Sequence, residues 1–165
     1  MKKYVFALLG FLILSSIDQW TKWVVCLKLQ GKGEVPVLGN VFVLQYLENR
    51  GAAFGVLQNQ QIFLIAITVG ILILLVFIYG KIPPMPRFHI LRGMDVLLAA
   101  GAVGNLIDRL FRGYVIDFFY FKLINFPVFN VADCYVVAAA FTSVILIGFY
   151  YKEEDWKKIT NEKNI

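Results

Sequence analysis

The stretch that decides the fold is IFLIAITVGILILLVFIY, from Ile62 to Tyr79, which contains no charged residue. An uncharged apolar run of about 18 residues or more is typical of a transmembrane helix. The rest of the chain agrees, because 59% of its 165 residues are hydrophobic and only 16% are charged. Soluble chains are about 45–50% apolar. The composition predicts an integral membrane protein, and we expect residues 1–165 to form a single domain.

Three further apolar runs, residues 4–25, 90–111 and 131–151, are also long enough to cross the hydrocarbon core. The first begins like a secretory signal peptide, but it lacks an A-x-A-like cleavage site and becomes apolar again after Asp18 and Gln19. We therefore expect a membrane all-α bundle of four transmembrane helices, at about residues 4–25, 62–79, 90–111 and 131–151. The third run contains small residues that permit close helix packing, namely Ala99, Ala100, Gly101, Ala102 and Gly104.

Basic residues set the expected orientation of the bundle. By the positive-inside rule, the regions that contain them, and with them both termini, lie in the cytoplasm. This distribution explains the net charge of +5, so we expect no nucleic-acid partner. At this inner boundary we expect an ordinary pair between Arg92 and Asp95, no polar cluster comparable to the one at the outer boundary, and a frayed helical tail. The basic residues that cluster at the N-terminus, between the second and third apolar runs and at the C-terminus are Lys2, Lys3, Lys81, Arg87, Arg92, Lys152, Lys157, Lys158 and Lys163.

The segments expected outside the membrane are residues 26–61 and 112–130. The first contains VPVLGNVFVLQYL, residues 35–47, in which Val, Phe and Tyr flank a Gly-Asn turn. This pattern predicts short strands, and therefore a small extracytoplasmic β-containing segment between helices 1 and 2. The second segment is expected to be an outer loop that carries Asp117.

Polar residues converge on the outer boundary of the predicted bundle. Carboxylates beside lipid cost free energy, so a group of them indicates a functional site. Residues three or four apart share a helix face, which brings Asp18 beside Lys22 and Asn105 beside Asp108. The converging residues are Asp18, Lys22, Asn49, Asn105, Asp108, Arg109, Asp117, Asn130 and Asp133.

Most of these residues also have a purely structural explanation, and the sequence leaves both explanations open. An ion pair can hold a helix, and a carboxylate at the start of a helix can cap it. The structural alternatives are a neutralised pair of Asp18 with Lys22, a helix-end pair of Asp108 with Arg109, and a capping box formed by Asn130-Val-Ala-Asp133.

Asp117 is harder to explain in this way, because its sequence neighbours are apolar or aromatic and no base lies beside it. Such surroundings raise the pKa of a carboxyl group. Two carboxyl groups brought together cannot both ionise cheaply, so one keeps its proton. The ionised group then takes a proton from water, and the protonated one hydrogen-bonds the carbonyl under attack. Helix dipoles favour the ionised form of Asp133, which leaves Asp117 as the protonated partner.

Other kinds of site have little support in the sequence. Cys26 and Cys134 form neither a disulfide framework nor a CxxC motif, and His89, the single histidine, has no partner for metal binding. We therefore expect no metal and no cofactor.

Five short blocks of the chain match one family in the family's order, and the apolar runs between them match as well. The chain resembles the lipoprotein signal peptidases, or signal peptidase II. The blocks are Ile-Asp-Gln-Trp-Thr-Lys from Ile17 to Lys22, Asn-Arg-Gly-Ala-Ala-Phe-Gly from Asn49 to Gly55, Gly-Asn-Leu-Ile-Asp-Arg from Gly104 to Arg109, Val-Ile-Asp-Phe from Val115 to Phe118, and Phe-Asn-Val-Ala-Asp from Phe129 to Asp133.

The resemblance implies an intramembrane aspartyl endopeptidase of the bacterial cytoplasmic membrane, with its active site near the outer face. It implies a diacylglyceryl-modified prolipoprotein substrate, cut immediately before the lipid-modified cysteine, and inhibition by globomycin. One chain supplies the whole dyad, so a monomer suffices, with membrane lipid around it. The implied roles are a catalytic dyad of Asp117 and Asp133; substrate-binding or positioning residues Asn49, Gly51, Asn105, Arg109 and Asn130; and supporting residues Asp18, Lys22 and Asp108.

Two other classes of protein are weighed against this one. A small four-helix proton-coupled transporter would place its essential acid near the membrane midplane, with polar access from both sides. The acids here crowd one boundary, which counts against transport. A scaffold without chemistry explains the apolar runs but not the converging polar residues. Other intramembrane aspartyl proteases are disfavoured because a Gly-x-Gly-Asp block is absent.

Overall fold

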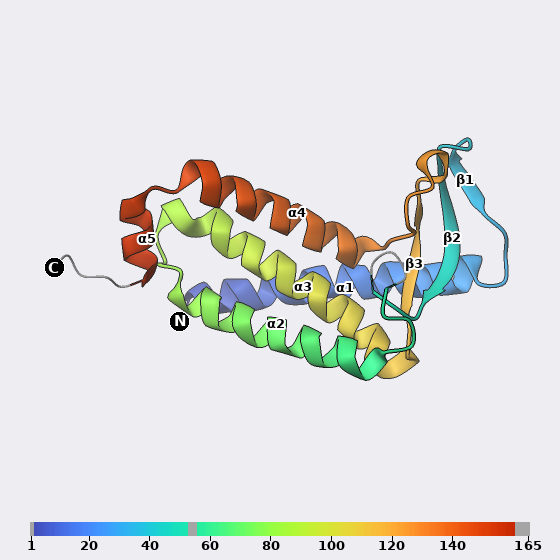
Figure 1. The fold of residues 1–165 in the computed structure, drawn as a ribbon, viewed down its shortest axis with the longest axis horizontal. Helices are drawn as coiled ribbons and strands as arrows, with labels where there is room; N and C mark the ends of the chain where they lie inside the picture. The colour runs from blue at the N-terminus through green and yellow to red at the C-terminus, as the bar shows by residue number, and fades with distance from the viewer. Residues whose placement is uncertain (1, 53–55, 161–165) are drawn as a thin grey trace.

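The computed structural model describes residues 2–52 and 56–160. Within them, four long helices form a bundle: α1 (Lys2–Leu29), α2 (Gln61–Lys81), α3 (His89–Arg112) and α4 (Val131–Ile145). Figure 1 shows these helices along the long axis of the molecule, with a sheet at one end and the short helix α5 at the other. The four helical segments are long and apolar enough to cross a membrane, so the predicted four-helix bundle is confirmed. Residues 53–55 of the second matching block, and Lys163, lie outside the described residues.

The outward faces of the helices are apolar, as lipid contact requires. On α2, Ile62 and Val76 are exposed, and the buried residues are Leu64, Leu75 and Tyr79. A helix satisfies its own backbone hydrogen bonds, so such a segment can stand in lipid with most of its side chains facing outward.

Helix α3 contacts each of the other three long helices and is the centre of the bundle. Its glycines let α4 and α1 approach closely. A Cβ atom on Gly101 would lie 2.6 Å from the carbonyl oxygen of Ala132, and one on Gly104 would collide with the carboxylate of Asp18. The predicted use of small residues for close packing is therefore confirmed at these two positions.

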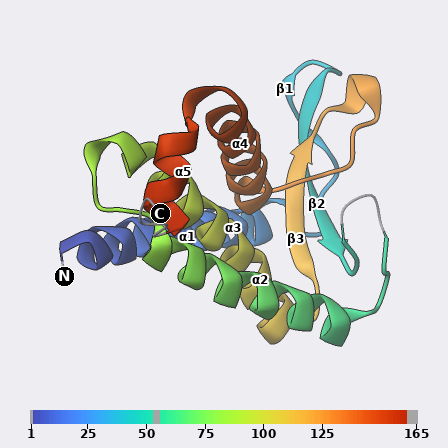
Figure 2. The same cartoon turned by 60° about the vertical axis from the view of Figure 1, so that its left-hand side comes forward.

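A three-stranded antiparallel sheet stands at the end of the bundle, in the order β1-β2-β3 (Figure 2). Strands β1 (Val35–Leu38) and β2 (Phe42–Asn49) lie between α1 and α2, where the sequence predicts strands. The third strand, β3 (Val115–Tyr120), comes from the segment between α3 and α4. The short turn η3 (Lys122–Ile124) follows it.

The expectation that Asp117 lies in an outer loop is wrong, because this residue lies inside β3. Its partner across the sheet is Leu47 of β2, and two residues further along Val115 pairs with Asn49. The first four residues of β3 are all buried, so the strand lacks the alternation of apolar and polar residues that reveals a half-exposed strand in a sequence. The sheet therefore brings Asn49 and Asp117 to the same place.

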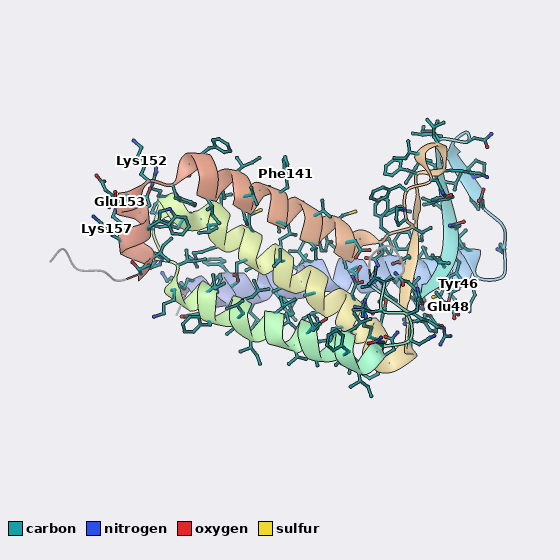
Figure 3. The ribbon with its side chains drawn as sticks, in the orientation of Figure 1. Tyr46, Glu48, Phe141, Lys152, Glu153 and Lys157 are labelled. Carbon is teal, nitrogen blue, oxygen red and sulfur yellow. The ribbon has the colours of Figure 1, made fainter. Side chains whose placement is uncertain are left out.

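At the opposite end, the segment after α4 is ordered and packed against the bundle. Helix α4 continues as a π-helical turn, η4 (Leu146–Tyr150), and α5 (Glu153–Thr160) follows. The turn η2 (Pro86–Phe88) precedes α3 and carries Arg87, whose guanidinium binds the carboxylate of Asp155 at 2.7 and 2.8 Å. The expected helix in the tail is confirmed, but the expectation that it is frayed is wrong, because Arg87 holds it against the bundle. Figure 3 shows Lys152 and Lys157 at this end, far from Tyr46 on the sheet.

The expected pair between Arg92 and Asp95 is also wrong. Arg92 donates hydrogen bonds to the hydroxyl of Tyr79 at 2.8 Å and to the carbonyl of Lys3 at 3.4 Å. Spacing along a helix places two residues on one face, but it does not show which neighbouring helix each long side chain reaches.

The contact between Arg87 and Asp155 predicts how firmly α5 is held. The hydrogen bond from Arg87 holds the pKa of Asp155 below its ordinary value, so the pair is ionised at neutral pH. We expect Asp155→Asn to loosen α5 and to speed cleavage by trypsin after Lys157 and Lys158 several-fold, as measured by mass spectrometry. Glu153→Gln is the matched control, because Glu153 makes only an exposed pair with Lys157. Equal cleavage of both variants would contradict the role of Asp155.

Candidate active site

The buried ammonium group of Lys22 lies between two carboxylates at the sheet end of the bundle. Its Nζ atom lies 2.9 Å from Asp18 Oδ2 and 3.1 Å from Asp108 Oδ2, and all three side chains are fully buried. The same ammonium donates to Asn105 Oδ1 at 2.9 Å. The predicted pair of Asp18 and Lys22 is confirmed, and it is part of a larger charged cluster that joins α1 to α3.

The proposed helix-end pair of Asp108 with Arg109 is wrong. Asp108 pairs instead with Lys22 and, at 3.3 Å, with the Nε atom of Arg112. Arg109 turns away and donates from Nη2 to the carbonyl oxygen of Gly51 at 3.1 Å. The i, i+4 spacing of Asp108 and Arg112 is a signal that the sequence analysis missed.

The two carboxylates beside Lys22 also tether the backbone of other elements. Asp18 Oδ1 accepts from the backbone N–H of Ala132 at 2.9 Å, and Asp108 Oδ2 accepts from the N–H of Ile116 at 3.2 Å. Each tethered amide lies one residue before an acid of the predicted dyad, Asp133 or Asp117. The cluster around Lys22 thus fixes the backbone positions from which both acids extend.

Asn130 is hydrogen-bonded to both acids of the predicted dyad. Its Nδ2 atom donates to Asp117 Oδ1 at 2.6 Å and to Asn105 Oδ1 at 3.1 Å, and its Oδ1 atom accepts from the backbone N–H of Asp133 at 3.1 Å. Asn130 is fully buried, so these contacts replace those that water would make.

The predicted capping box at the start of α4 is confirmed, and it uses only one of the two carboxylate oxygens of Asp133. Asp133 Oδ2 accepts from the backbone N–H of Asn130 at 3.0 Å, which completes the box. Asp133 Oδ1 instead accepts from Asn105 Nδ2 at 2.8 Å. Capping and a role in the site are therefore compatible.

A second asparagine holds Asp117 from the sheet. Asn49 Nδ2 donates to Asp117 Oδ2 at 2.9 Å, and Asn49 Oδ1 accepts from the backbone N–H of Gly51 at 2.9 Å. A Cβ atom on Gly51 would lie 2.7 Å from the carbonyl oxygen of Val56, so this turn has room for glycine only.

The carboxyl group of Asp117, in the sheet, has a strongly raised pKa. Burial, and then the nearby charge of Asp133, raise the pKa of Asp117 to about 7, against the opposing effect of hydrogen bonds from Asn49 and Asn130. Near neutral pH this carboxyl group therefore exchanges readily between its protonated and ionised forms. A pair in which one acid holds a proton and the other is ionised is equipped for acid–base catalysis.

Gln19 also belongs to this region, although no sequence pattern singled it out. Its Nε2 atom donates to Asp18 Oδ2 at 3.1 Å and to the carbonyl oxygen of Gly104 at 3.0 Å, so it strengthens the link between α1 and α3. Its position beside Asp18 in the first matching block was the available signal. Among the described residues, no group of three His, Cys, Asp or Glu side chains is placed to hold a metal ion.

Comparison with known proteins decides the family. The family model described as Signal peptidase (SPase) II matches residues 10–149. The chain belongs to the signal peptidase II family. It is 44% identical over 134 residues to a lipoprotein signal peptidase of Caldanaerobacter subterraneus subsp. tengcongensis, which covers 81% of this chain and 86% of that relative. Relatives with the same description occur in Clostridioides difficile, at 38% identity over 87% of this chain and 95% of the relative, and in Streptococcus pyogenes, at 37% over 94% and 99%.

Solved structures support the same conclusion for the fold. Two structures described as bacterial membrane enzymes are each 27% identical to this chain. One aligns with a TM-score of 0.73 over 97% of this chain and 93% of the solved one, and the other with 0.74 over 88% and 94%. This member of the signal peptidase II family is therefore a multi-pass bacterial membrane protein. Its family membership implies that it is a protease.

The buried cluster predicts that Lys22 is essential to the folded state. Lys22→Met would leave the carboxylates of Asp18 and Asp108 without their shared cation, and breaking a buried ion pair from one side costs about 3–5 kcal/mol. We expect a large drop in the unfolding temperature in detergent. Lys28→Met is the matched control, because Lys28 is an exposed lysine on the same helix. A Lys22→Met protein as stable as the parent would refute the bridging role of the ammonium group.

Proposed function

We propose that this chain is an intramembrane aspartyl endopeptidase that removes the signal peptide from diacylglyceryl-modified prolipoproteins by cutting before the lipid-modified cysteine. Asp117 and Asp133 are the catalytic dyad. The observation that carries the proposal is their shared partner, since Asn130 contacts the carboxylate of Asp117 and the backbone of Asp133. The family and the names of its relatives supply the class of substrate.

In the proposed reaction, the two acids have different roles. The ionised carboxylate of Asp133 takes a proton from a water molecule, whose oxygen forms a bond to the carbonyl carbon of the scissile peptide. The protonated carboxyl of Asp117 gives its proton to the carbonyl oxygen, which produces a neutral tetrahedral intermediate. Collapse of this intermediate breaks the C–N bond: the amine of the cysteine takes the proton from Asp133, and a hydroxyl of the intermediate returns one to Asp117. Both acids then have their starting protonation states.

The neighbouring residues support this division of roles. Asp133 accepts hydrogen bonds from Asn105 and from the backbone N–H of Asn130 at the start of α4, whereas the sheet buries Asp117 among apolar side chains. Asn49, Asn105 and Asn130 hold the oxygens of the dyad in place. Arg109 donates a hydrogen bond to the carbonyl of Gly51, whose own N–H donates to Asn49, and these contacts give Arg109 and Gly51 a positioning role.

We place the dyad near the outer face of the cytoplasmic membrane, with both termini in the cytoplasm. The start of α1, the α2–α3 connection and α5 lie together at the end opposite the sheet (Figure 1), and these are the regions rich in Lys and Arg. Aromatic rings gather at the sheet end, as they do at membrane–water interfaces. They include Phe42, Phe119, Phe121, Phe126 and Phe129.

Cleavage of a purified prolipoprotein tests the proposal. We expect the parent protein in detergent to cut a diacylglyceryl-modified substrate before the modified cysteine, as mapped by mass spectrometry, and globomycin to block the reaction. Asp117→Asn and Asp133→Asn should each lower kcat by about 10²–10⁴-fold, because each removes a proton-transfer group.

Two controls make this experiment decisive. Glu34→Gln removes a carboxylate that pairs with Lys122 at the surface of the sheet, and it should leave kcat unchanged. Thermal unfolding and globomycin binding show whether each variant is folded. If folded Asp133→Asn protein still turns over at the parent rate, then Asp133 only caps α4 and the dyad assignment fails.

The raised pKa of Asp117 predicts the pH dependence of the reaction. Its proton is needed for catalysis, so kcat/KM should be high below pH 7 and fall as the pH rises through about 7. The hydrogen bond from Asn49 favours the ionised form and so lowers the pKa. Asn49→Ala should therefore move the fall in kcat/KM to higher pH while Glu34→Gln leaves it in place. A shift to lower pH would contradict the assigned role of Asp117.

A further inference from the structure

Asp95 is an acid inside a membrane-spanning helix that the proposed reaction does not use. It lies on α3, about two turns from the cytoplasmic start of that helix, and its side chain is half-buried. No hydrogen bond or ion pair joins it to any other described residue. The other carboxylates of the described spans, Asp18, Asp108 and Asp133, all have such partners at the outer end.

Among the residues that the structure describes, no cation pairs with Asp95. Arg92, which lies one turn away, binds Tyr79 and the carbonyl of Lys3 instead. An ionisable group at membrane depth is costly, and such groups usually face a partner or a pathway. A partner from outside the chain would have to carry positive charge and to enter the membrane.

Asp95 and Arg109 mark the two ends of one face of α3. Fourteen residues separate them, which is nearly four turns of 3.6 residues and about 21 Å along the axis. Between them on this face lie the half-buried Ala99 and Ala102, whose small side chains permit another helix to approach. At the outer end, Arg109 contacts Gly51 beside the dyad.

A secretory signal segment has the matching layout. It has a positively charged N-terminal part followed by an apolar part of about 7–15 residues, and its cleavage site lies beyond that. As a helix, 14 residues of such a segment cover about 21 Å. With the cleavage site at the dyad and the N-terminal part toward the cytoplasm, its basic residues reach the level of Asp95. Anionic lipid headgroups, in contrast, are repelled by a carboxylate.

We propose that Asp95 pairs with a basic side chain near the N-terminus of the substrate's signal helix, so that the charge at that end of the substrate determines how well it is cleaved. This inference rests on the proposed function and adds a specificity-determining residue to it. The face of α3 from Asp95 to Arg109 is then the surface against which the signal helix lies.

The test uses three diacylglyceryl-modified substrates that differ only in two N-terminal residues, which are both Lys, both Gln or both Glu. Cleavage is measured in detergent micelles, where orientation across a bilayer plays no part. We expect the parent protein to cleave the Lys substrate with a kcat/KM about three- to tenfold above that of the Gln substrate, and the Glu substrate least well. Asp95→Asn should abolish this preference, and Asp95→Lys should reverse it. Glu154→Gln, an exposed acid of α5, is the matched control and should keep the parent's preference.

Each outcome has a distinct meaning. Equal cleavage of all three substrates by the parent, or an unchanged preference in Asp95→Asn, would overturn the pairing while leaving the proposed function intact. Failure of the parent to cleave any of the three would overturn the proposed function, and this inference with it. The substrate series on the parent needs no altered protein, and Asp95 has no partner within the described chain whose loss would disturb the fold.

Discussion

The buried ammonium of Lys22 is the constraint on which the rest of the site depends. Lipid does not solvate a charge, so each carboxylate at this depth needs a cation or hydrogen-bond donors from the protein itself. Lys22 supplies the cation for Asp18 and Asp108 together and thereby joins α1 to α3. The carboxylates of these two acids also accept hydrogen bonds from the backbone N–H groups directly before Asp133 and Asp117. A charge-balancing cluster thus also positions the catalytic pair of the proposed reaction.

The two acids of that pair differ because different elements carry them. Asp133 begins a helix, where its carboxylate accepts hydrogen bonds from Asn105 and the backbone of Asn130, whereas Asp117 lies in a buried strand, where burial favours the neutral form. Asn130 connects them without adding charge. A pair of acids in such unlike surroundings can hold one proton between them near neutral pH, and this supports assigning a separate role to each.

Much of this arrangement could be predicted from local patterns, because hydropathy marks the spans and spacing along one helix marks the pair of Asp18 and Lys22 and the box that starts α4. The failures involve contacts between distant segments. Strand β3 is buried in every one of its first four positions, so it shows no alternation. Arg92 prefers a tyrosine on another helix to its neighbour Asp95, and α5 is held by Arg87 from the α2–α3 connection. No local pattern contains these partners.

Infrared spectroscopy of the carboxyl C=O stretch during a pH titration tests the central claim most directly, since it detects the proton on Asp117 itself. We expect a protonated-carboxyl band in the parent that disappears as the pH rises through about 7. The same band should be absent at every pH from a folded Asp117→Asn protein and present in Glu34→Gln. If the parent and the Asp117→Asn protein show the same carboxyl bands, then Asp117 is ionised throughout the titration. That result would contradict the division of roles between the two acids.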